Sequence, residues 1–359
     1  MNQDWKILQS KTIDALRFPM AVAVVMLHYS MFIMDDAHGA LRGLCIFFQE
    51  GICRLAVPCF FFISGFLFFR GLRAWSWSEW KRKIRNRGRS LLLPYLLWNI
   101  LALFAYWAWN NLTGTRIGLF EEFHHLGGIR IFYSRTGALP IGPQASPLDD
   151  PLWFIRDLMY YILVTPAIYL FLKYTRGYGM LGMCILFLAI RRSVPEGFVF
   201  FTLGAYMQYS EKNIIRYLHP ARHWFYCLFV PLLAVTLLFY GTSEYWNRFC
   251  KFFFMINGIA ASFCLSAEIL EKKPELPLPF LASSSFFIFA LHNVLVLRKI
   301  AAPAVYAIIP ADTTIGGIAA FFLIPTLAVG ICLGLLWVLQ KLLPRTTALL
   351  TGNRQIQTA

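Results

Sequence analysis

The sequence predicts an all-α membrane protein, a polytopic bundle of about ten transmembrane helices. Hydrophobic residues make up 58% of the 359 residues and charged residues only 14%, a composition typical of integral membrane proteins. Apolar runs of about 17 to 25 residues, long enough to cross a bilayer as helices, recur along the chain. Basic residues lie mostly between these runs, where they orient helices, so the net charge of +15 does not predict a nucleic-acid partner.

Most of the apolar runs predict single spans, because their lengths match the hydrocarbon core and they carry few charges. These runs lie near residues 13–33, 51–69, 91–109, 152–171, 223–240, 251–269, 281–297 and 318–340. The stretch 178–210 holds two shorter runs, split by Arg191, Arg192, Ser193 and Pro195, which we interpret as a tight helical hairpin. We expect one domain over residues 1–359. No small-residue cleavage pattern follows the first run, so it is expected to stay as a helix.

The distribution of Lys and Arg predicts the orientation of the bundle. With an even number of spans both termini face the same side, and loops rich in basic residues stay in the cytoplasm. The loop 70–90 is such a loop, with Arg70, Arg73, Lys81, Arg82, Lys83, Arg85, Arg87 and Arg89. Both termini are therefore predicted to be cytoplasmic, and the loop 110–151 faces outside, where we expect it to recognise a substrate. Its Glu121 and His125 lack a third ligand at metal spacing, so no metal site is predicted.

The first apolar run contains two ionisable residues, Arg17 and His28. Eleven residues correspond to three helical turns plus about 20°, so both side chains lie on one face, about 16 Å apart. An ionisable side chain at mid-bilayer costs about 2.5 kcal/mol or more on insertion scales, so we expect both to face a protein interior or a wet cavity. The alternative is an Arg that snorkels to the interface and a His that only packs.

On the predicted topology, Arg17 lies near the cytoplasmic edge and His28 lies in the outer half of the bilayer. Polar residues of other spans share this outer depth, namely Arg54, Trp153, Arg156, Asp157, Glu196 and His292. Polar residues at one depth on several helices indicate a cavity. For Arg156 and Asp157, a structural role near a helix start is an equal expectation, and for His292 the alternative is a histidine satisfied by a neighbouring helix.

Several motifs resemble those of acyltransferase family 3, and they occur in the family's order. The first is Arg17 followed by ten residues and then His28, in the first span. The others are VPCFFFISGF around Ser64, LLLPY at the end of the basic loop and PLWFIRD at residues 151–157. The stretch from Ser285 to His292 also resembles the family's aromatic-rich helix that ends in His. The resemblance covers nearly the whole chain.

This resemblance implies an enzyme of the bacterial inner membrane that moves an acyl group, commonly acetyl from acetyl-CoA, to a hydroxyl of an envelope carbohydrate or lipid-linked glycan. Some members transfer succinyl instead. No metal or resident cofactor is implied, because acyl-CoA is a substrate. The expected partners are the acyl-CoA donor, the glycan acceptor and membrane lipid, and a homodimer is left open. The sequence departs from the family at Ser90, where a second Arg would be needed, and Arg87 and Arg89 are expected to compensate.

The residue types fit this reaction. Acyl-CoA carries phosphate charges, so we expect Arg17, Arg85, Arg87 and Arg89 to bind it from the cytoplasm. His28 is the candidate general base for the acceptor hydroxyl, and the outer arginines or His292 would stabilise the oxyanion. Arg54, Trp153, Arg156, Asp157, Glu196 and Ser64 are expected to bind substrate.

An acyl relay through Ser64 is an alternative to direct transfer. Ser-Gly in a membrane helix is, however, more often a packing surface. Two other function classes also stay open. A polytopic transporter or flippase for a polysaccharide or lipid-linked glycan has similar helices and intramembrane charges, and a non-catalytic scaffold in polysaccharide export is the third reading.

Overall fold

The computed structural model is all-helical over the residues that it describes, 2–72, 75–134, 141–191, 193–276, 279–310 and 313–352. Six helical stretches are long and apolar enough to cross a membrane: Asp4–Ile33, Gly39–Phe69, Trp77–Leu112, Ile214–Leu238, Glu244–Lys272 and Thr314–Leu342. Two bent helix pairs, Asp150–Leu163 with Thr165–Ala189 and Pro279–Leu291 with Leu295–Tyr306, raise the number to eight if each pair is one span. The predicted all-helical, multi-pass membrane architecture is confirmed, whereas the count of ten is not.

The first three spans include helices that begin earlier than the apolar runs. The first is α1 (Asn2–Ile33). The second joins α2 (Gly39–Ile46), η1 (Phe47–Gly51), η2 (Ile52–Leu55) and α3 (Ala56–Phe69). The third joins α4 (Trp77–Arg87), η3 (Gly88–Leu92) and α5 (Leu93–Leu112). Much of the predicted basic loop 70–90 is thus helical, and Ser76 caps α4 by accepting a hydrogen bond from the Glu79 backbone N–H. Arg73 lies outside the described residues.

The polar segment 110–151 contains α6 (Leu119–His125) and the short turns η4 (Gly128–Phe132), η5 (Pro143–Ala145) and η6 (Asp150–Leu152). Its residues 135–140 lie outside the described part of the chain. The second half of the chain continues through α7 (Trp153–Leu163), α8 (Thr165–Ala189), α9 (Glu196–Tyr209), α10 (Ile214–Leu218), α11 (Arg222–Leu238) and α12 (Glu244–Lys272). It ends with α13 (Pro279–Leu291), η8 (His292–Ala301), α14 (Ala302–Tyr306), α15 (Thr314–Leu342) and α16 (Pro344–Leu350).

In the region of α7, α8 and α9 the helices are bent or short, so the number of spans predicted there is not confirmed. The helices α7 and α8 meet at a bend of 60°, and α8 is broken again at Arg176, whose φ is 50°. The predicted hairpin over 178–210 is present as the last part of α8 and α9, with Arg192 outside the described residues. The helix α9 has 14 residues, fewer than the roughly 20 that a transmembrane helix needs.

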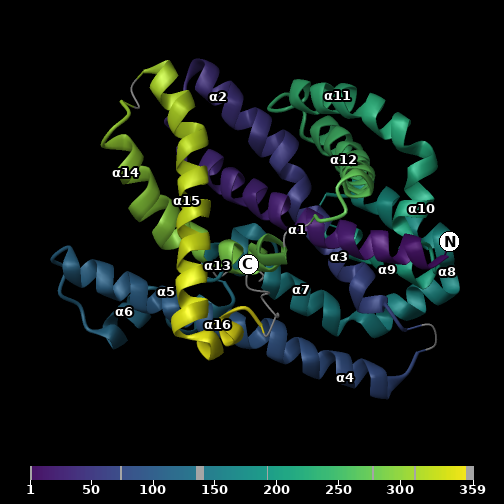
Figure 1. Cartoon of the computed structure of the whole chain (residues 1–359), viewed down its shortest axis with the longest axis horizontal. Coiled ribbons are helices and arrows are strands. Elements are labelled where there is room, and N and C mark those ends of the chain that lie inside the picture. The colour runs from purple at the N-terminus through teal and green to yellow at the C-terminus, as the bar shows by residue number, and fades with distance from the viewer. Residues whose placement is uncertain are drawn as a thin grey trace.

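The helices α3 and α9 approach each other unusually closely next to α1, in the middle of the bundle (Figure 1). A Cβ atom on Gly65 of α3 would lie 1.9 Å from the carbonyl oxygen of Phe201, and one on Gly204 of α9 would lie 1.9 Å from that of Phe62. Only glycine allows this backbone contact, which is the small-residue packing that membrane helices use.

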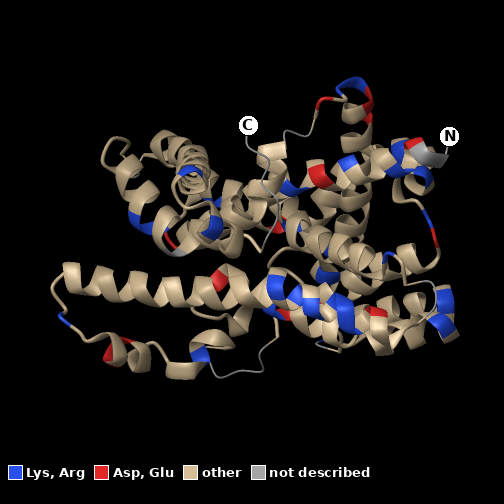
Figure 2. Cartoon of the chain, turned by 60° about the horizontal axis from the view of Figure 1, so that its bottom comes forward, with Lys and Arg blue, Asp and Glu red and all other residues tan. Residues whose placement is uncertain are grey.

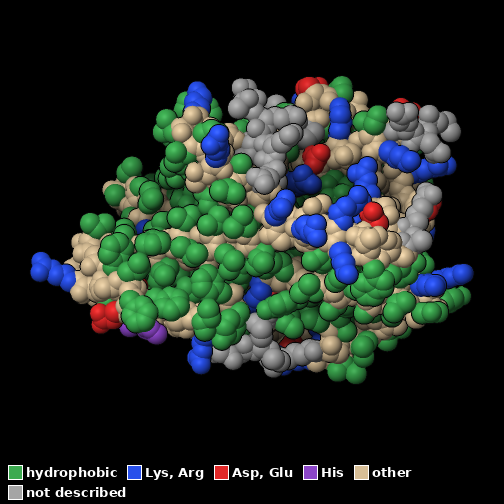
Figure 3. Space-filling model, turned by 90° about the horizontal axis from the view of Figure 1, so that it is seen from below, with side chains coloured by type: hydrophobic (Ala, Val, Ile, Leu, Met, Phe, Trp, Pro, Cys, Tyr) green, Lys and Arg blue, Asp and Glu red, His purple; other side chains and the backbone are tan. Residues whose placement is uncertain are grey.

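Charged side chains are confined to a few parts of the molecule. Lys and Arg gather along α4 and near the start of α1, whereas long stretches of the other helices carry none (Figure 2). Seen from below the view of Figure 1, hydrophobic side chains cover broad parts of the surface (Figure 3). Such a surface is expected where helices face lipid rather than water.

Candidate functional site

His28 on α1 and His292, which follows α13, form a direct hydrogen bond. Nδ1 of His28 lies 2.7 Å from Nε2 of His292, and the two ring planes are only 11° apart. His292 is fully buried, and His28 is partly buried beside it. The winding changes at this point from α13 to the π-helix η8, a distortion that is frequent at functional sites. The sequence analysis selected both histidines, but it did not predict that they touch.

The hydrogen-bond partners of His292 determine where the protons of a neutral pair lie. Nδ1 of His292 is 2.9 Å from the carbonyl oxygen of Ile288 and 3.0 Å from that of Phe289. Carbonyl oxygens only accept, so this nitrogen is the donor, and Nε2 of a neutral His292 keeps its lone pair. Nδ1 of His28 must then donate to Nε2 of His292, which leaves Nε2 of His28 with a lone pair. A histidine held in this state can accept a proton from a substrate.

A second contact holds the same helices together. The hydroxyl groups of Tyr29 and Tyr306 lie 2.7 Å apart and join α1 to α14. Tyr29 follows His28 in the chain and is fully buried. Tyr306 was not identified from the sequence, because nothing in the spacing of one helix tells which residue of a distant helix will face it. Together, the His28–His292 and Tyr29–Tyr306 hydrogen bonds hold α1 against the region of α13 and α14.

A cavity of about 630 Å³, here called the aromatic cavity, extends from charged residues to Phe289 of α13. Its charged lining residues are Lys11, Asp14, Arg17, Arg87 and Glu275. Its other walls are largely apolar and include Phe154 and Phe289. The ring centroid of Phe289 lies 6.5 Å from that of His292. The aromatic cavity therefore reaches from Arg17 to Phe289, a neighbour of His292, although neither histidine is among its lining residues.

Arg17 is partly exposed and pairs with Asp14, one turn earlier on α1, at 2.7 Å. Besides the aromatic cavity, it lines a larger one of about 870 Å³, here called the basic cavity, where α1 begins and α3 and α9 end. Arg17 thus lies where the two cavities meet. This position agrees with the expectation that Arg17 faces a cavity rather than lipid.

Ser64 and Gly65 face different surroundings although they are neighbours on α3. Gly65 makes the backbone contact with α9, as described above, whereas Ser64 lines the aromatic cavity. The packing role that the Ser-Gly pair suggests therefore belongs to Gly65. Ser64 remains a residue that a ligand in the aromatic cavity can touch.

The three arginines of the basic loop that are predicted to bind acyl-CoA have different environments. Arg87 lines the aromatic cavity near Arg17. Arg85 and Arg89 are exposed on the outside of α4 and η3. Helical geometry explains the difference, because residues two apart on a helix point about 200° apart.

Arg156 and Asp157 on α7 form a buried pair that holds the segment 110–151. Arg156 donates to Oδ1 of Asp157 from Nε at 3.0 Å and from Nη2 at 2.7 Å. Its remaining donors bind the carbonyl oxygens of Tyr133, Gly142 and Ala145. Asp157 in turn accepts from the backbone N–H of Gly142 at 2.7 Å. All five donors of the guanidinium are therefore used within the protein, which favours the structural alternative for this pair. Trp153, on the same helix, packs on Phe61 with ring centroids 6.3 Å apart.

Arg54 and Glu196 form an ion pair between η2 and the start of α9, with 3.2 Å between Nη2 of Arg54 and Oε2 of Glu196. A second ion pair joins Glu50, four residues before Arg54 in the chain, to Lys251 of α12. Nε of Arg54 is buried without a hydrogen-bond partner. The sequence analysis named Arg54 and Glu196 but missed Glu50 and Lys251. The signal in the sequence that could have found Glu50 and Lys251 is their position at the edges of two predicted spans, 51–69 and 251–269.

Comparisons with known proteins agree with this architecture. A family model described as an acyltransferase domain matches residues 10–338. The chain is 27% identical over 363 residues to the succinoglycan biosynthesis protein ExoH of Rhizobium meliloti (strain 1021), and the match covers 96% of this chain and 92% of that protein. No solved structure matches the chain.

Proposed function

The chain belongs to acyltransferase family 3, and we propose that it is a membrane O-acyltransferase that moves an acyl group from cytosolic acyl-CoA to a hydroxyl of an envelope glycan. The observation that carries this proposal is the His28–His292 hydrogen bond, next to Phe289, which lines the aromatic cavity. A base with an available lone pair, beside a cavity that leads to cationic residues, is what transfer from a phosphorylated thioester to a hydroxyl requires.

The reaction follows from the proton positions of the pair. Nε2 of His28 takes the proton of the acceptor hydroxyl, and the hydroxyl oxygen attacks the thioester carbonyl. The tetrahedral intermediate collapses as the carbon–sulfur bond breaks. The imidazolium of His28 then returns its proton to the sulfur, so that free CoA and the ester are released. His292 acts as a positioning residue in this scheme, because it holds His28 in the required tautomer through Nδ1.

The aromatic cavity fits the acyl-bearing arm of the donor. Its three cations, Lys11, Arg17 and Arg87, outnumber the carboxylates of Asp14 and Glu275 and suit phosphate. Its walls near Phe154 and Phe289 suit an uncharged chain. This arm would bridge the distance between Arg17 and His28, which supports direct transfer over a relay through Ser64. An acetyl group fits the aromatic end better than a succinyl group, because the free carboxylate of the succinyl group would lose hydration there.

We place the acceptor on the opposite side of the histidine pair, at the outer face of an inner membrane. The ion pairs Arg54–Glu196 and Glu50–Lys251 provide carboxylates and cations that can hydrogen-bond sugar hydroxyl groups. The name of the relative ExoH, a succinoglycan biosynthesis protein, supports a polysaccharide or its lipid-linked precursor as the acceptor class. Arg156 and Asp157 contribute by holding the segment 110–151 in place.

Incubation of the purified, nanodisc-embedded protein with acetyl-CoA labelled in its acetyl group tests this function. We expect transfer to an added glycan, or slow release of labelled acetate when no acceptor is present. Movement of a glycan across a liposome membrane without loss of the acetyl label would assign the chain to transport instead. Absence of both donor cleavage and donor binding would favour a scaffold role and would overturn the proposal.

A further inference from the structure

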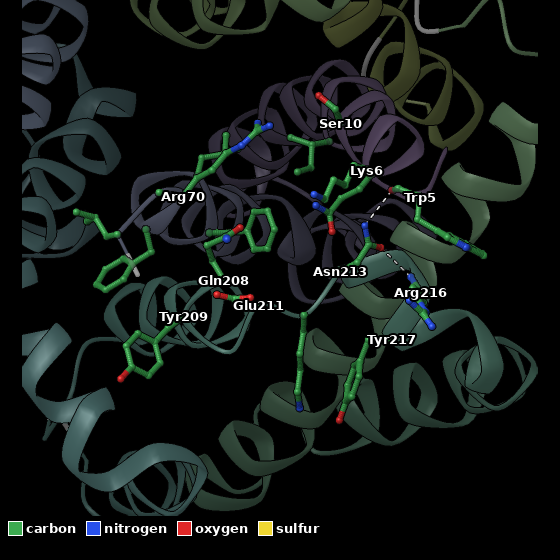
Figure 4. A pocket seen from close by; sticks show the side chains of 18 of the residues that line it. Trp5, Lys6, Ser10, Arg70, Gln208, Tyr209, Glu211, Asn213, Arg216 and Tyr217 are labelled. Atoms are coloured by element: carbon green, nitrogen blue, oxygen red, sulfur yellow. Dashed lines mark hydrogen bonds between the residues drawn. The ribbon is translucent and has the colours of Figure 1, made fainter. Parts of the chain in front are cut away.

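The basic cavity is a second, larger space beside the aromatic cavity. Of the arginines predicted to bind the donor, Arg17 alone is among its lining residues. It lies between the first turns of α1, the ends of α3 and α9, and α10. Figure 4 shows side chains from α1, such as Lys6, and side chains from the α9–α10 region, such as Asn213 and Glu211, around the same space. Its volume is about 870 Å³, within the range of sites for organic ligands.

Hydrogen bonds between α1 and α10 hold the wall of the basic cavity in place. The side-chain amide of Asn213 donates to the carbonyl oxygen of Trp5 at 2.9 Å, and its oxygen accepts from the backbone N–H of Arg216 (Figure 4). The backbone N–H of Ile214 donates to the side chain of Gln9 at 2.6 Å. The contacts with Trp5 and Gln9 join residues more than 200 positions apart. The cavity is therefore largely formed before a ligand binds.

The residues that line the basic cavity carry a surplus of positive charge. Two carboxylates, of Asp14 and Glu211, are opposed by the cations of Lys6, Arg17, Arg70, Lys212 and Arg216. The surplus of three positive charges suits a ligand with several phosphate charges. Three aromatic side chains, those of Trp5, Tyr209 and Tyr217, line the same space and offer faces for a planar base. The ammonium group of Lys212 lies 4.3 Å from the ring centroid of Tyr217, so a cation and an aromatic ring are already adjacent.

The two cavities share a wall. Asp14, Arg17 and Leu67 line both of them. A ligand with a bulky anionic head and a thin arm can occupy both, with its head in the basic cavity and its arm passing Arg17. The exposed Arg85 and Arg89 of the α4 region line neither cavity.

We propose that the basic cavity binds the phosphorylated adenosine end of the acyl-CoA donor, while the aromatic cavity receives the arm. This assignment rests on the proposed function, and it moves recognition of the nucleotide from the arginines of α4 to Lys6, Lys212 and Arg216. The phosphates bind the cations, and the adenine ring packs on an aromatic side chain of the same cavity.

The test compares two donors in nanodiscs of zwitterionic lipid. Acetyl-CoA has the nucleotide, and S-acetyl-pantetheine has only the arm. In the double variant Lys6→Ala with Lys212→Ala, we expect the KM for acetyl-CoA to rise by about tenfold or more, because two charge-assisted contacts are lost. The KM for S-acetyl-pantetheine and kcat should stay within about twofold. Lys81→Ala, an exposed lysine on α4 outside both cavities, is the matched control and should change neither. The double variant Lys6→Arg with Lys212→Arg should restore most of the affinity for acetyl-CoA.

A binding measurement separates this inference from the proposed function. Adenosine 3′,5′-bisphosphate should bind the wild-type protein and lose about tenfold in affinity in the Lys6→Ala, Lys212→Ala variant. This binding does not depend on acetyl transfer. Binding of the probe without any acetyl transfer would therefore contradict the proposed function but not the proposed nucleotide site. An unchanged KM for acetyl-CoA, or an equal rise for both donors, would overturn the pocket while the function stands. An effect that appears only when anionic lipid is added would assign the cations to lipid headgroups and would also overturn it.

Discussion

Nδ1 of His28 lies 2.7 Å from Nε2 of His292, although 264 positions separate the two residues in the chain. Because His292 also donates to the carbonyl oxygens of Ile288 and Phe289, this contact orients the proton of His28 towards its partner. The free lone pair of His28 is then on Nε2. A proton-accepting atom of this kind is the feature on which the proposed acyl transfer depends.

Replacing His292 tests its positioning role. His292→Leu removes the acceptor for Nδ1 of His28, and we expect kcat to fall by about 10² or more, since loss of a tautomer-holding group costs about 10⁴ in serine proteases. His292→Gln should restore part of kcat, because its amide oxygen can accept from His28. The measurement is kcat and KM for acetyl-CoA at several pH values, per folded protein. A His292→Leu protein with unchanged kcat would reduce His292 to a packing residue.

Ser64 distinguishes direct transfer from a relay. It lines the aromatic cavity, but the proposed reaction does not use its hydroxyl as a nucleophile. Ser64→Ala should therefore keep kcat within about fivefold, since a lost hydrogen bond of ordinary strength costs about 1 kcal/mol. Ser64→Phe should raise the KM for acetyl-CoA, because the larger ring fills the cavity. A loss of activity in Ser64→Ala, together with an acetyl group on Ser64 in the wild type by mass spectrometry, would establish the relay.

Arg156 is expected to act on stability. Its guanidinium is 2% exposed and binds Asp157 and three carbonyl oxygens, so Arg156→Ala leaves a buried carboxylate unpaired. Breaking such a pair costs about 3–5 kcal/mol. We expect a lower Tm in detergent and faster proteolysis within residues 110–151. Arg82→Ala removes an exposed ion pair with Glu79 and should change stability by about 1 kcal/mol or less. Normal stability with a raised KM for the acceptor would instead assign Arg156 to substrate binding.

The contact between α3 and α9 predicts a sharp difference between two glycines. In Gly65→Ala the new Cβ would lie 1.9 Å from the carbonyl oxygen of Phe201, so the helices must separate. Overpacking of this kind costs about 1–3 kcal/mol or more, and we expect a lower Tm by fluorescence-detected size exclusion. Gly330→Ala on α15 is the matched control, because beyond the neighbouring turns of its own helix no atom of the described residues lies within 4 Å of its Cβ position. It should be neutral or slightly stabilising. Equal Tm values for the two variants would contradict the described packing.

The sequence predicts the class of fold well, because hydropathy reports directly on which helices can lie in lipid. It does not settle the number of spans around α8 and α9, because these helices are broken or short. The close contact of Gly65 and Gly204 shows that α9 is apolar at least where it packs on α3. A hydropathy profile cannot distinguish burial against α3 from burial in lipid.

The candidate site could be predicted only in part. Arg17 and His28 stand out because an ionisable residue within an apolar run is energetically costly and is usually functional. Their spacing defines one helix face but does not identify the partner helix. The contact of His28 with His292 and the hydrogen bond between Tyr29 and Tyr306 are therefore visible only in the structure. The same holds for Lys251, whose partner Glu50 is 201 positions away.

The most direct test of the account is the activity of His28→Ala with acetyl-CoA and a glycan acceptor, measured on nanodisc-embedded protein of wild-type Tm. Loss of the general base should lower kcat by about 10²–10⁴, with little change in the affinity for acetyl-CoA. His28→Gln, which can still donate to His292 but has no basic nitrogen, should be equally impaired. Acetylation of the acceptor at the wild-type rate by folded His28→Ala protein would contradict the central claim.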